Sequence, residues 1–138
     1  MAVFEEFELY GHMITSNRYK QGIDIEYDDR RYDKKTHGIY ILRNSDNDVV
    51  KIGNTRCIDN RFHIQYRHTR NTTNDRVREY VKDFEETLSI WVYEVPTYVE
   101  DVLGMDVRYS PVDDLERKIL TEYKERYTLL PELNVVLR

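Results

Sequence analysis

The feature that most constrains the fold is a pair of short apolar segments separated by a turn cluster. Gly38 to Leu42 is apolar and β-branched, and Val49 to Ile52 is apolar again except for Lys51. The residues between them, Asn44 to Asp48, are the small polar types that favour tight turns. Two strands joined by such a turn form a β-hairpin, which the sequence therefore predicts.

Periodicity after this hairpin predicts two short helices and a third strand. Apolar residues recur every three or four positions from Ile58 to Tyr66 and again from Arg76 to Phe84, which is helical spacing. The polar run Asn71 to Asn74 separates these two predicted helices. Leu88 to Val95 has the character of a strand and is closed by Pro96, which cannot donate to a sheet ladder.

The most clearly predicted helix lies near the C-terminus. Ser110 is a preferred N-cap residue, and Pro111 suits the first helical position. An apolar stripe then continues at helical spacing, and the helix is expected to end before Pro131. The stripe consists of Val112, Leu115, Ile119, Tyr123 and Tyr127. Leu133 to Val136 is predicted to be an extended tail, whereas Thr97 to Tyr109 is interpreted as a loop or insertion.

The first part of the chain, residues 1–36, carries no motif that we can place. Val3 to Tyr10 has helical spacing, and Ile23 to Tyr27 alternates like a strand. We interpret residues 1–36 as an N-terminal extension of unknown role in front of a domain formed by residues 37–138. The order of the predicted elements indicates the α+β class, with a small antiparallel three-stranded sheet flanked by helices.

Composition limits the number of domains and the partners. A chain of 138 residues that is 40% hydrophobic can bury one sizeable core. Its net charge of −5 argues against coating nucleic acid through an overall positive field, so contact with nucleic acid must be local. A single cysteine, Cys57, excludes an intrachain disulfide and suits a reducing compartment. Without a signal-peptide pattern or a long apolar run, we expect an intracellular protein, cytoplasmic or nuclear, with no membrane partner.

Five features follow one another in a defined order along the chain. They are the triplets Gly38-Ile39-Tyr40 and Lys51-Ile52-Gly53, followed by Arg61, Glu116 and Asn134. Arg61 follows Gly53 by eight residues. In order and spacing these residues resemble the GIY-YIG nuclease superfamily, and the resemblance extends over residues 38–136. It implies a GIY-YIG nuclease-like domain with the triplets on paired strands, the arginine on the first helix and the glutamate on a later helix.

The resemblance implies a metal-dependent endonuclease that hydrolyses DNA phosphodiester bonds and nicks one strand per active site. Tyr40 would hydrogen-bond the attacking water and act as its general base, with electrostatic help from Lys51 on the paired strand. Arg61 would clamp the non-bridging phosphate oxygens with its planar guanidinium group. Glu116 would hold one divalent cation, Mg²⁺ or Mn²⁺, which polarises the phosphate or the leaving group.

Two positions depart from the family pattern. The second triplet begins with Lys51 where its namesake has tyrosine, although a subgroup that includes phage and large-virus proteins has lysine there. One helical turn after the arginine the family often has histidine or tyrosine, whereas this chain has Gln65. The neighbouring Tyr66 is the candidate to replace it, although one residue is a rotation of about 100° on an α-helix.

A local basic segment could provide the contact with DNA that the net charge makes unlikely elsewhere. Between Lys51 and Lys82, basic residues and histidines outnumber acidic residues, which suits salt-dependent contact with phosphates. A solvated helix face is the alternative interpretation. The candidate DNA-binding residues are Arg56, Arg67, Arg70 and Asn134, of which Asn134 could equally orient the substrate or satisfy backbone groups in the tail.

Three functions remain open on sequence alone. The first is the endonuclease, for which a homodimer would allow cleavage of both strands. The second is a catalytically weak or inactive DNA-binding module on the same fold, which the departures at Lys51 and Gln65 would favour. The third is a phage- or virus-encoded interaction protein that binds a host partner through its acidic surface.

Overall fold

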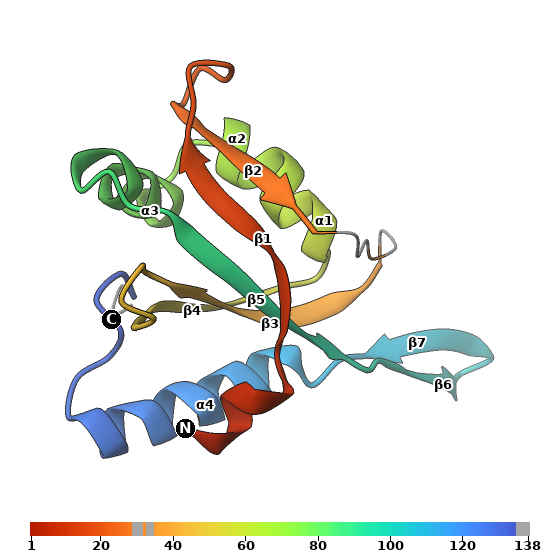
Figure 1. The fold of residues 1–138 in the computed structure, drawn as a ribbon. Helices are drawn as coiled ribbons and strands as arrows, with labels where there is room; N and C mark the ends of the chain where they lie inside the picture. Colours follow the sequence, from red (N-terminus) through yellow and green to blue (C-terminus); the bar gives the residue numbers. More distant parts are fainter. Residues whose placement is uncertain (29–31, 33–34, 135–138) are drawn as a thin grey trace.

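The computed structural model describes residues 1–28, 32 and 35–134, and within them the chain forms a five-stranded antiparallel sheet covered by helices (Figure 1). The strand order is β2-β1-β5-β3-β4. The strands are β1 (Glu8–Thr15), β2 (Ile23–Tyr27), β3 (His37–Arg43), β4 (Val49–Thr55) and β5 (Leu88–Val95). The predicted α+β class is confirmed, but the sheet is larger than the predicted three strands because residues 1–36 contribute β1 and β2.

The predicted hairpin is confirmed as β3 and β4, which pair in antiparallel register. Its turn is held by Asn44, whose side-chain oxygen accepts hydrogen bonds from the backbone N–H groups of Asp46 and Asp48. Asn47 adopts a φ of 66°, which asparagine tolerates better than most residues. The register places Tyr40 directly opposite Gly53 and so brings the two sequence triplets into contact.

Strand β1 was not predicted, because its sequence does not alternate. The helical spacing that begins at Val3 produces only the short 3₁₀ helix η1 (Ala2–Glu6), and the chain is extended from Glu8 onward. A β-bulge between Leu9 and Gly11 shifts the register against β5, so the buried residues do not follow a period of two. The expectation of a helix that reaches Tyr10 is therefore wrong.

Helices cover both faces of the sheet. On one face, a continuous helical segment is followed by a longer helix, and on the other face η1 and the C-terminal helix pack (Figure 1). The helices are α1 (Ile58–Asn60), the π-helix η2 (Arg61–Gln65), α2 (Tyr66–His68), α3 (Thr72–Asp83) and α4 (Val112–Tyr127). Strand β3 contributes Tyr40 and Leu42 to the first core and Ile39 and Ile41 to the second, which explains its continuous apolar sequence.

The segment interpreted as a loop or insertion is a second hairpin. It comprises β6 (Tyr98–Val102) and β7 (Met105–Tyr109), which follow β5 and extend away from the main sheet (Figure 1). The two turn residues, Leu103 and Gly104, have φ angles of 56° and 76°, as a tight hairpin turn requires. Helix α4 then begins close to its predicted start, and Ser110 accepts a hydrogen bond from the Val112 N–H.

The C-terminal segment returns to the free edge of the sheet. The Leu133 N–H donates to the Val50 carbonyl at 2.8 Å, so the segment docks on β4. Val135 and Val136, the rest of the predicted extended tail, lie outside the described residues. Across the described ranges, no helix is long and apolar enough to cross a membrane.

Candidate active site

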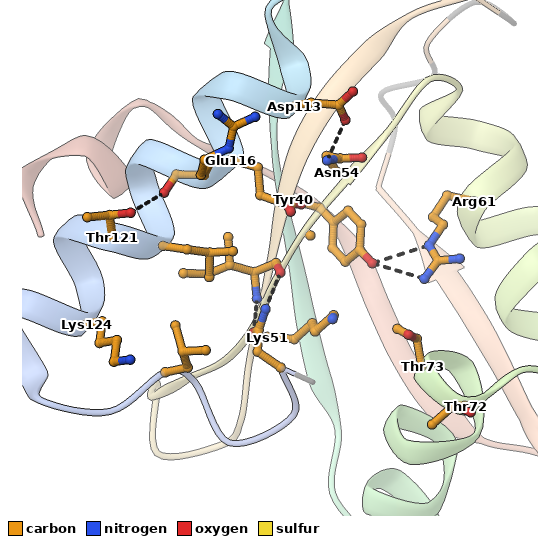
Figure 2. Close-up of a pocket in the computed structure, with 16 residues that line it drawn as sticks. Tyr40, Lys51, Asn54, Arg61, Thr72, Thr73, Asp113, Glu116, Thr121 and Lys124 are labelled. Carbon is orange, nitrogen blue, oxygen red and sulfur yellow. Dashed lines mark hydrogen bonds between the residues drawn. The ribbon is translucent and has the colours of Figure 1, made fainter. Parts of the chain in front are cut away.

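A cleft of about 890 Å³ surrounds the edge strand β4 and collects most of the predicted site residues. One wall is formed by α4 and the other by η2 and the start of α3, with β3 and β4 between them (Figure 2). The predicted residues that line it are Tyr40, Lys51, Arg61, Glu116 and Asn134. These residues are up to 94 positions apart in the sequence. They meet because β3 and β4 lie between the two helical walls of the cleft.

Tyr40 is fixed at the centre of the cleft by close packing against Gly53. Its side chain is only 2% exposed. A Cβ atom at position 53 would lie 2.5 Å from the Tyr40 hydroxyl oxygen and 2.7 Å from Cε1, well inside ordinary contact distance. The glycine of the second triplet is therefore required because the ring of the first triplet's tyrosine lies directly over its backbone.

The Tyr40 hydroxyl is the centre of a hydrogen-bonded cluster. Arg61 donates to it from Nε at 3.3 Å and from Nη2 at 3.2 Å (Figure 2). A further hydrogen bond of 2.9 Å joins the hydroxyls of Tyr40 and Tyr66. Burial opposes the charge of Arg61, but the two tyrosines outweigh this effect and raise its pKa. The guanidinium group is thus permanently charged and held in one orientation.

A π-helical turn places Tyr66 next to Arg61. The Tyr66 N–H donates to the Arg61 carbonyl, five residues earlier, instead of to the residue four before it. This extra residue per turn rotates Tyr66 onto the face that Gln65 would occupy in an α-helix. The Arg61 guanidinium lies 4.4 Å from the centre of the Tyr66 ring. Tyr66 therefore lies beside Arg61, about one helical turn later, and Gln65 also contacts Arg61 by accepting a hydrogen bond from it at 2.7 Å.

Helix α3 holds this π-helical segment in place. Asn74 is fully buried and donates to the carbonyls of Gln65 and Thr69. Arg78, also buried, donates to the carbonyl of Tyr66 at 2.8 Å. The Gln65 carbonyl also accepts from the Thr69 N–H at 2.9 Å, so the two side chains add hydrogen bonds to carbonyls at the end of this helical segment, where partners within the helix run out. Arg78 belongs to the predicted basic segment, but it is an internal structural residue.

Tyr66 itself lies behind Tyr40 and does not line the cleft. Burial raises the pKa of Tyr66, and the nearby Tyr40 raises it further. The Tyr66 hydroxyl therefore keeps its proton at neutral pH. Its place in the cluster is to hold the Tyr40 hydroxyl and the Arg61 guanidinium together.

Lys51 faces the same cleft from β4 and is only 7% exposed. Burial lowers its pKa, and the neighbouring Arg61 lowers it further, whereas Tyr40 and Glu116 act in the opposite direction. Within the described ranges, the Lys51 ammonium group has no hydrogen bond or ion pair. A desolvated cation without a direct partner is available to an anionic ligand in the cleft.

Glu116 reaches the cleft from α4, on the opposite side of β4. Burial raises the pKa of Glu116, and the nearby Asp113 carboxylate raises it further, whereas Lys51 and Asn54 act in the opposite direction. Asn54 also donates to Asp113 at 3.1 Å, one helical turn before Glu116 (Figure 2). Two carboxylates, those of Glu116 and Asp113, thus lie one helical turn apart on α4 and border the same cleft.

These donors fit a divalent cation that keeps most of its water ligands. Mg²⁺ prefers oxygen ligands and dehydrates reluctantly, so one or two carboxylates are enough to hold it. In the part of the chain that the structure describes, no group of three acidic, histidine or cysteine side chains could form a closed metal cage. The Glu116 carboxylate therefore suits Mg²⁺ or Mn²⁺, and Asp113, which lines the same cleft, could supply a second oxygen.

Asn134 uses its side chain to bind the backbone of β4. Its Oδ1 accepts from the Ile52 N–H at 2.9 Å, and its Nδ2 donates to the Ile52 carbonyl at 2.8 Å. The amide thus imitates a neighbouring strand at the free edge of the sheet. Of the open roles for Asn134, satisfaction of backbone groups is the one that these contacts support, although the groups belong to β4 and not to the tail.

The three predicted DNA-binding arginines do not line the cleft. Arg56 is exposed and pairs with Asp113 at 3.1 Å, so it borders the cleft through that carboxylate. Arg70 is exposed and pairs with Asp75. Arg67 is 13% exposed and pairs with Asp24 at 2.7 Å, which makes it part of the interior. The predicted basic segment is therefore not one continuous exposed face.

The cleft also contains polar residues that are not among the predicted site residues. Thr72 and Thr73 lie at the start of α3, in the run that was interpreted only as a break between helices. Lys124 lies two helical turns after Glu116 on α4, a spacing that could have indicated a shared face. The charged residues that line the cleft are Lys51, Arg61, Arg117 and Lys124 against Asp113 and Glu116. The cleft is locally cationic although the whole chain is acidic.

No model of a protein family matches the sequence, and no curated protein matches it. Two solved structures share its fold. Restriction endonuclease HPY188I in complex with product DNA has a TM-score of 0.63 and 18% identity, and the match covers 94% of this chain and 80% of that chain. A glutamate-to-alanine variant of bacteriophage T4 EndoII has a TM-score of 0.67 and 13% identity, over 97% and 96% of the two chains. This chain therefore has the α+β fold of two solved endonucleases.

Proposed function

We propose that this protein is a metal-dependent endonuclease of the GIY-YIG type that hydrolyses DNA phosphodiester bonds, one strand per active site. The observation that carries the proposal is the pair Tyr40 and Arg61, held from behind by Tyr66, which lies across β4 from Glu116 in a cationic cleft. The fold that the chain shares with two endonucleases supports it, as does the complex of one of them with product DNA.

The scissile phosphate would bind between the two walls of the cleft. Arg61 presents a charged, pre-oriented guanidinium group, which can donate to two phosphate oxygens at once. Lys51 adds a second positive charge at a site where burial has removed most of its water. Both positive charges stabilise the negative charge that accumulates on the phosphate as the water attacks. A preorganised charge acts most strongly at that stage.

The attacking water would be positioned by Tyr40, which in its phenolate form, with its own proton already lost to solvent, would accept one proton from the water as the bond to phosphorus forms. The hydroxyl of Tyr40 is held in place from two directions, by Arg61 and by Tyr66, so it needs no rearrangement during the reaction. On the other side of β4, Glu116 would hold one Mg²⁺ or Mn²⁺ ion. When bound, such a cation polarises the phosphate and stabilises the leaving oxygen.

The test is the variant Glu116→Gln, which nearly preserves shape but removes the negative charge that would hold the cation. We expect nicking of supercoiled plasmid to fall to background in Mg²⁺, whereas DNA affinity at matched salt is retained or increases because one repulsive charge is lost. Burial raises the pKa of Glu116, so its ionised form is disfavoured in the folded protein. The glutamine variant should therefore be at least as stable as the wild type at neutral pH.

The matched control is Asp114→Asn on the same helix. Asp114 pairs with Lys118 at 3.2 Å and with the exposed Arg117 at 3.8 Å, but its own carboxylate does not line the cleft, so this variant loses the same charge without removing a group of the site. It should cleave like the wild type. If Glu116→Gln cleaves at nearly the wild-type rate, the cation lies elsewhere, and Asp113 is the next ligand to replace. A wild-type protein that binds DNA without cleaving it would instead indicate a DNA-binding module.

A further inference from the structure

The β6–β7 hairpin exposes an unusual amount of apolar surface. Every residue of its two strands is exposed except Val107, which is half-buried. The large apolar side chains in this group are Tyr98, Val99, Val102, Leu103, Met105 and Tyr109. A two-stranded hairpin without further packing is marginally stable in water, so an exposed apolar hairpin of this kind indicates a partner.

The cross-strand pairs divide the hairpin into two different faces. One face contains the pairs Tyr98 with Tyr109, Glu100 with Val107, and Val102 with Met105, and it is largely apolar. The opposite face places Asp101 directly across from Asp106. Like charges at opposed positions destabilise a strand pair. Within the described ranges, neither carboxylate has an ion-pair partner, so this repulsion is not neutralised inside one copy.

We propose that the outer edge of β7 pairs with β7 of a second copy of this chain, antiparallel and centred on Val107. The sequence of β7 is Met-Asp-Val-Arg-Tyr, so a two-fold axis at Val107 places Asp106 opposite Arg108 of the second copy, and Arg108 opposite its Asp106. Each interface then contains two complementary charge pairs. The carboxylate that is repelled within one copy is neutralised by the other.

The backbone of β7 is suited to this pairing. A two-residue turn makes Val102 and Met105 a hydrogen-bonded pair, and alternation along the strand makes Val107 and Tyr109 bond to β6 as well. The N–H and C=O groups of Asp106 and Arg108 therefore point to the free edge. These are the two residues that would exchange hydrogen bonds with the second copy. Among the residues that the structure describes, Arg108 hydrogen-bonds to Thr97 alone, through one nitrogen at 3.1 Å, so other donors of its guanidinium group are available.

Other pairings of the two edges bring like charges together. If β6 paired with itself about its centre, Glu100 would lie opposite Glu100 of the second copy. If β7 paired along the full length of β6, Asp106 would lie opposite Asp101 of the second copy. The pairing of β7 with β7 is the one that matches opposite charges. Because a two-fold axis relates its halves, it closes as a dimer and does not propagate into a fibre.

The resulting four-stranded sheet would also join the apolar faces of the two hairpins. Tyr109 would lie beside Met105 of the second copy, which extends each row of apolar side chains across four strands. Three or more strands with an apolar face are what such a sheet needs for stability. Pairing of exposed strand edges is also a common mode of protein association.

Charge reversal at β7 tests the proposal through the molecular mass of the protein in solution. This measurement does not depend on any nuclease activity. Sedimentation equilibrium should show a concentration-dependent dimer for the wild type. Asp106→Arg and Arg108→Asp should each weaken the dimer by roughly tenfold or more, because each places like charges opposite one another. A mixture of the two variants should associate again as a heterodimer, and the double variant D106R/R108D should regain the homodimer. Circular dichroism would verify that all variants are folded.

A cysteine at the two-fold axis provides a second measurement. Central residues of a non-hydrogen-bonded pair lie about 4.5 Å apart between Cα atoms, which is within disulfide range. Val107→Cys in a Cys57→Ser background should therefore oxidise to a covalent dimer, whereas the matched Glu100→Cys variant on β6 should not. A monomeric wild type at all concentrations would overturn the proposal. So would single charge variants that dimerise like the wild type, or equal crosslinking at positions 107 and 100.

Discussion

Replacement of Gly53 by alanine tests whether the second triplet serves to position Tyr40. The added Cβ would lie 2.5 Å from the Tyr40 hydroxyl oxygen, whereas ordinary contact begins at 3.4 Å, so the ring must retreat by about 1 Å. A displacement of this size at a reacting group costs roughly a hundredfold in rate. Overpacking of the core should also lower the free energy of unfolding by about 1–3 kcal/mol.

The assay is plasmid nicking at a temperature where the variant is folded, together with thermal unfolding. Gly38→Ala is the matched control, because the nearest neighbours of a Cβ there would be Ile58 Cδ1 at 2.7 Å and the Tyr93 carbonyl at 3.0 Å, and not the Tyr40 hydroxyl. Both variants should lose stability, and only Gly53→Ala should lose most of its activity. If Gly53→Ala is destabilised but cleaves at the wild-type rate, the position of the Tyr40 hydroxyl does not determine the reaction.

Two further variants test the roles of Lys51 and Tyr66 beside Tyr40 and Arg61. Burial lowers the pKa of Lys51, so the wild-type rate should fall at alkaline pH below the usual lysine value of about 10.4, as the cation is lost. Lys51→Met should cleave more slowly and should lack this alkaline fall, and a pH–rate profile that keeps it would exclude Lys51 as its cause. Tyr66→Phe removes the 2.9 Å hydrogen bond to Tyr40 but retains the ring beneath Arg61, so nicking should slow by roughly five- to tenfold, the effect of one neutral hydrogen bond. An unchanged rate in single-turnover nicking would show that Arg61 alone holds Tyr40.

Strong local patterns allowed several elements to be predicted from the sequence. The β3–β4 hairpin has two apolar runs around a turn cluster, and β5 occupies the residues expected for it. Helix α4 combines a capping serine, an early proline and a long apolar stripe. In each case the residues that define the element are close in sequence, so local propensity and burial favour the same structure.

Strand β1 and the β6–β7 hairpin lacked such a pattern. The bulge at Gly11 interrupts the alternation of β1, and only its pairing with β2 and β5 stabilises the extended form. The β6–β7 hairpin is exposed on nearly all of its residues, so neither of its faces shows the apolar and polar alternation of a half-buried strand. For both segments, long-range pairing and not local sequence determines the conformation.

Several groups that line the cleft could be named from the order and spacing of the sequence motifs, whereas Thr72, Thr73 and Lys124 could not. Tyr40, Lys51, Arg61 and Glu116 were selected from two triplets and their spacing, and they meet in one cleft. The place of Tyr66 beside them follows from long-range packing, because side chains of α3 hold the π-helical turn and the spacing of residues 61–66 does not predict it. Packing also makes Arg67 and Arg78 internal, since the charge of a residue does not indicate whether it faces solvent or a buried partner.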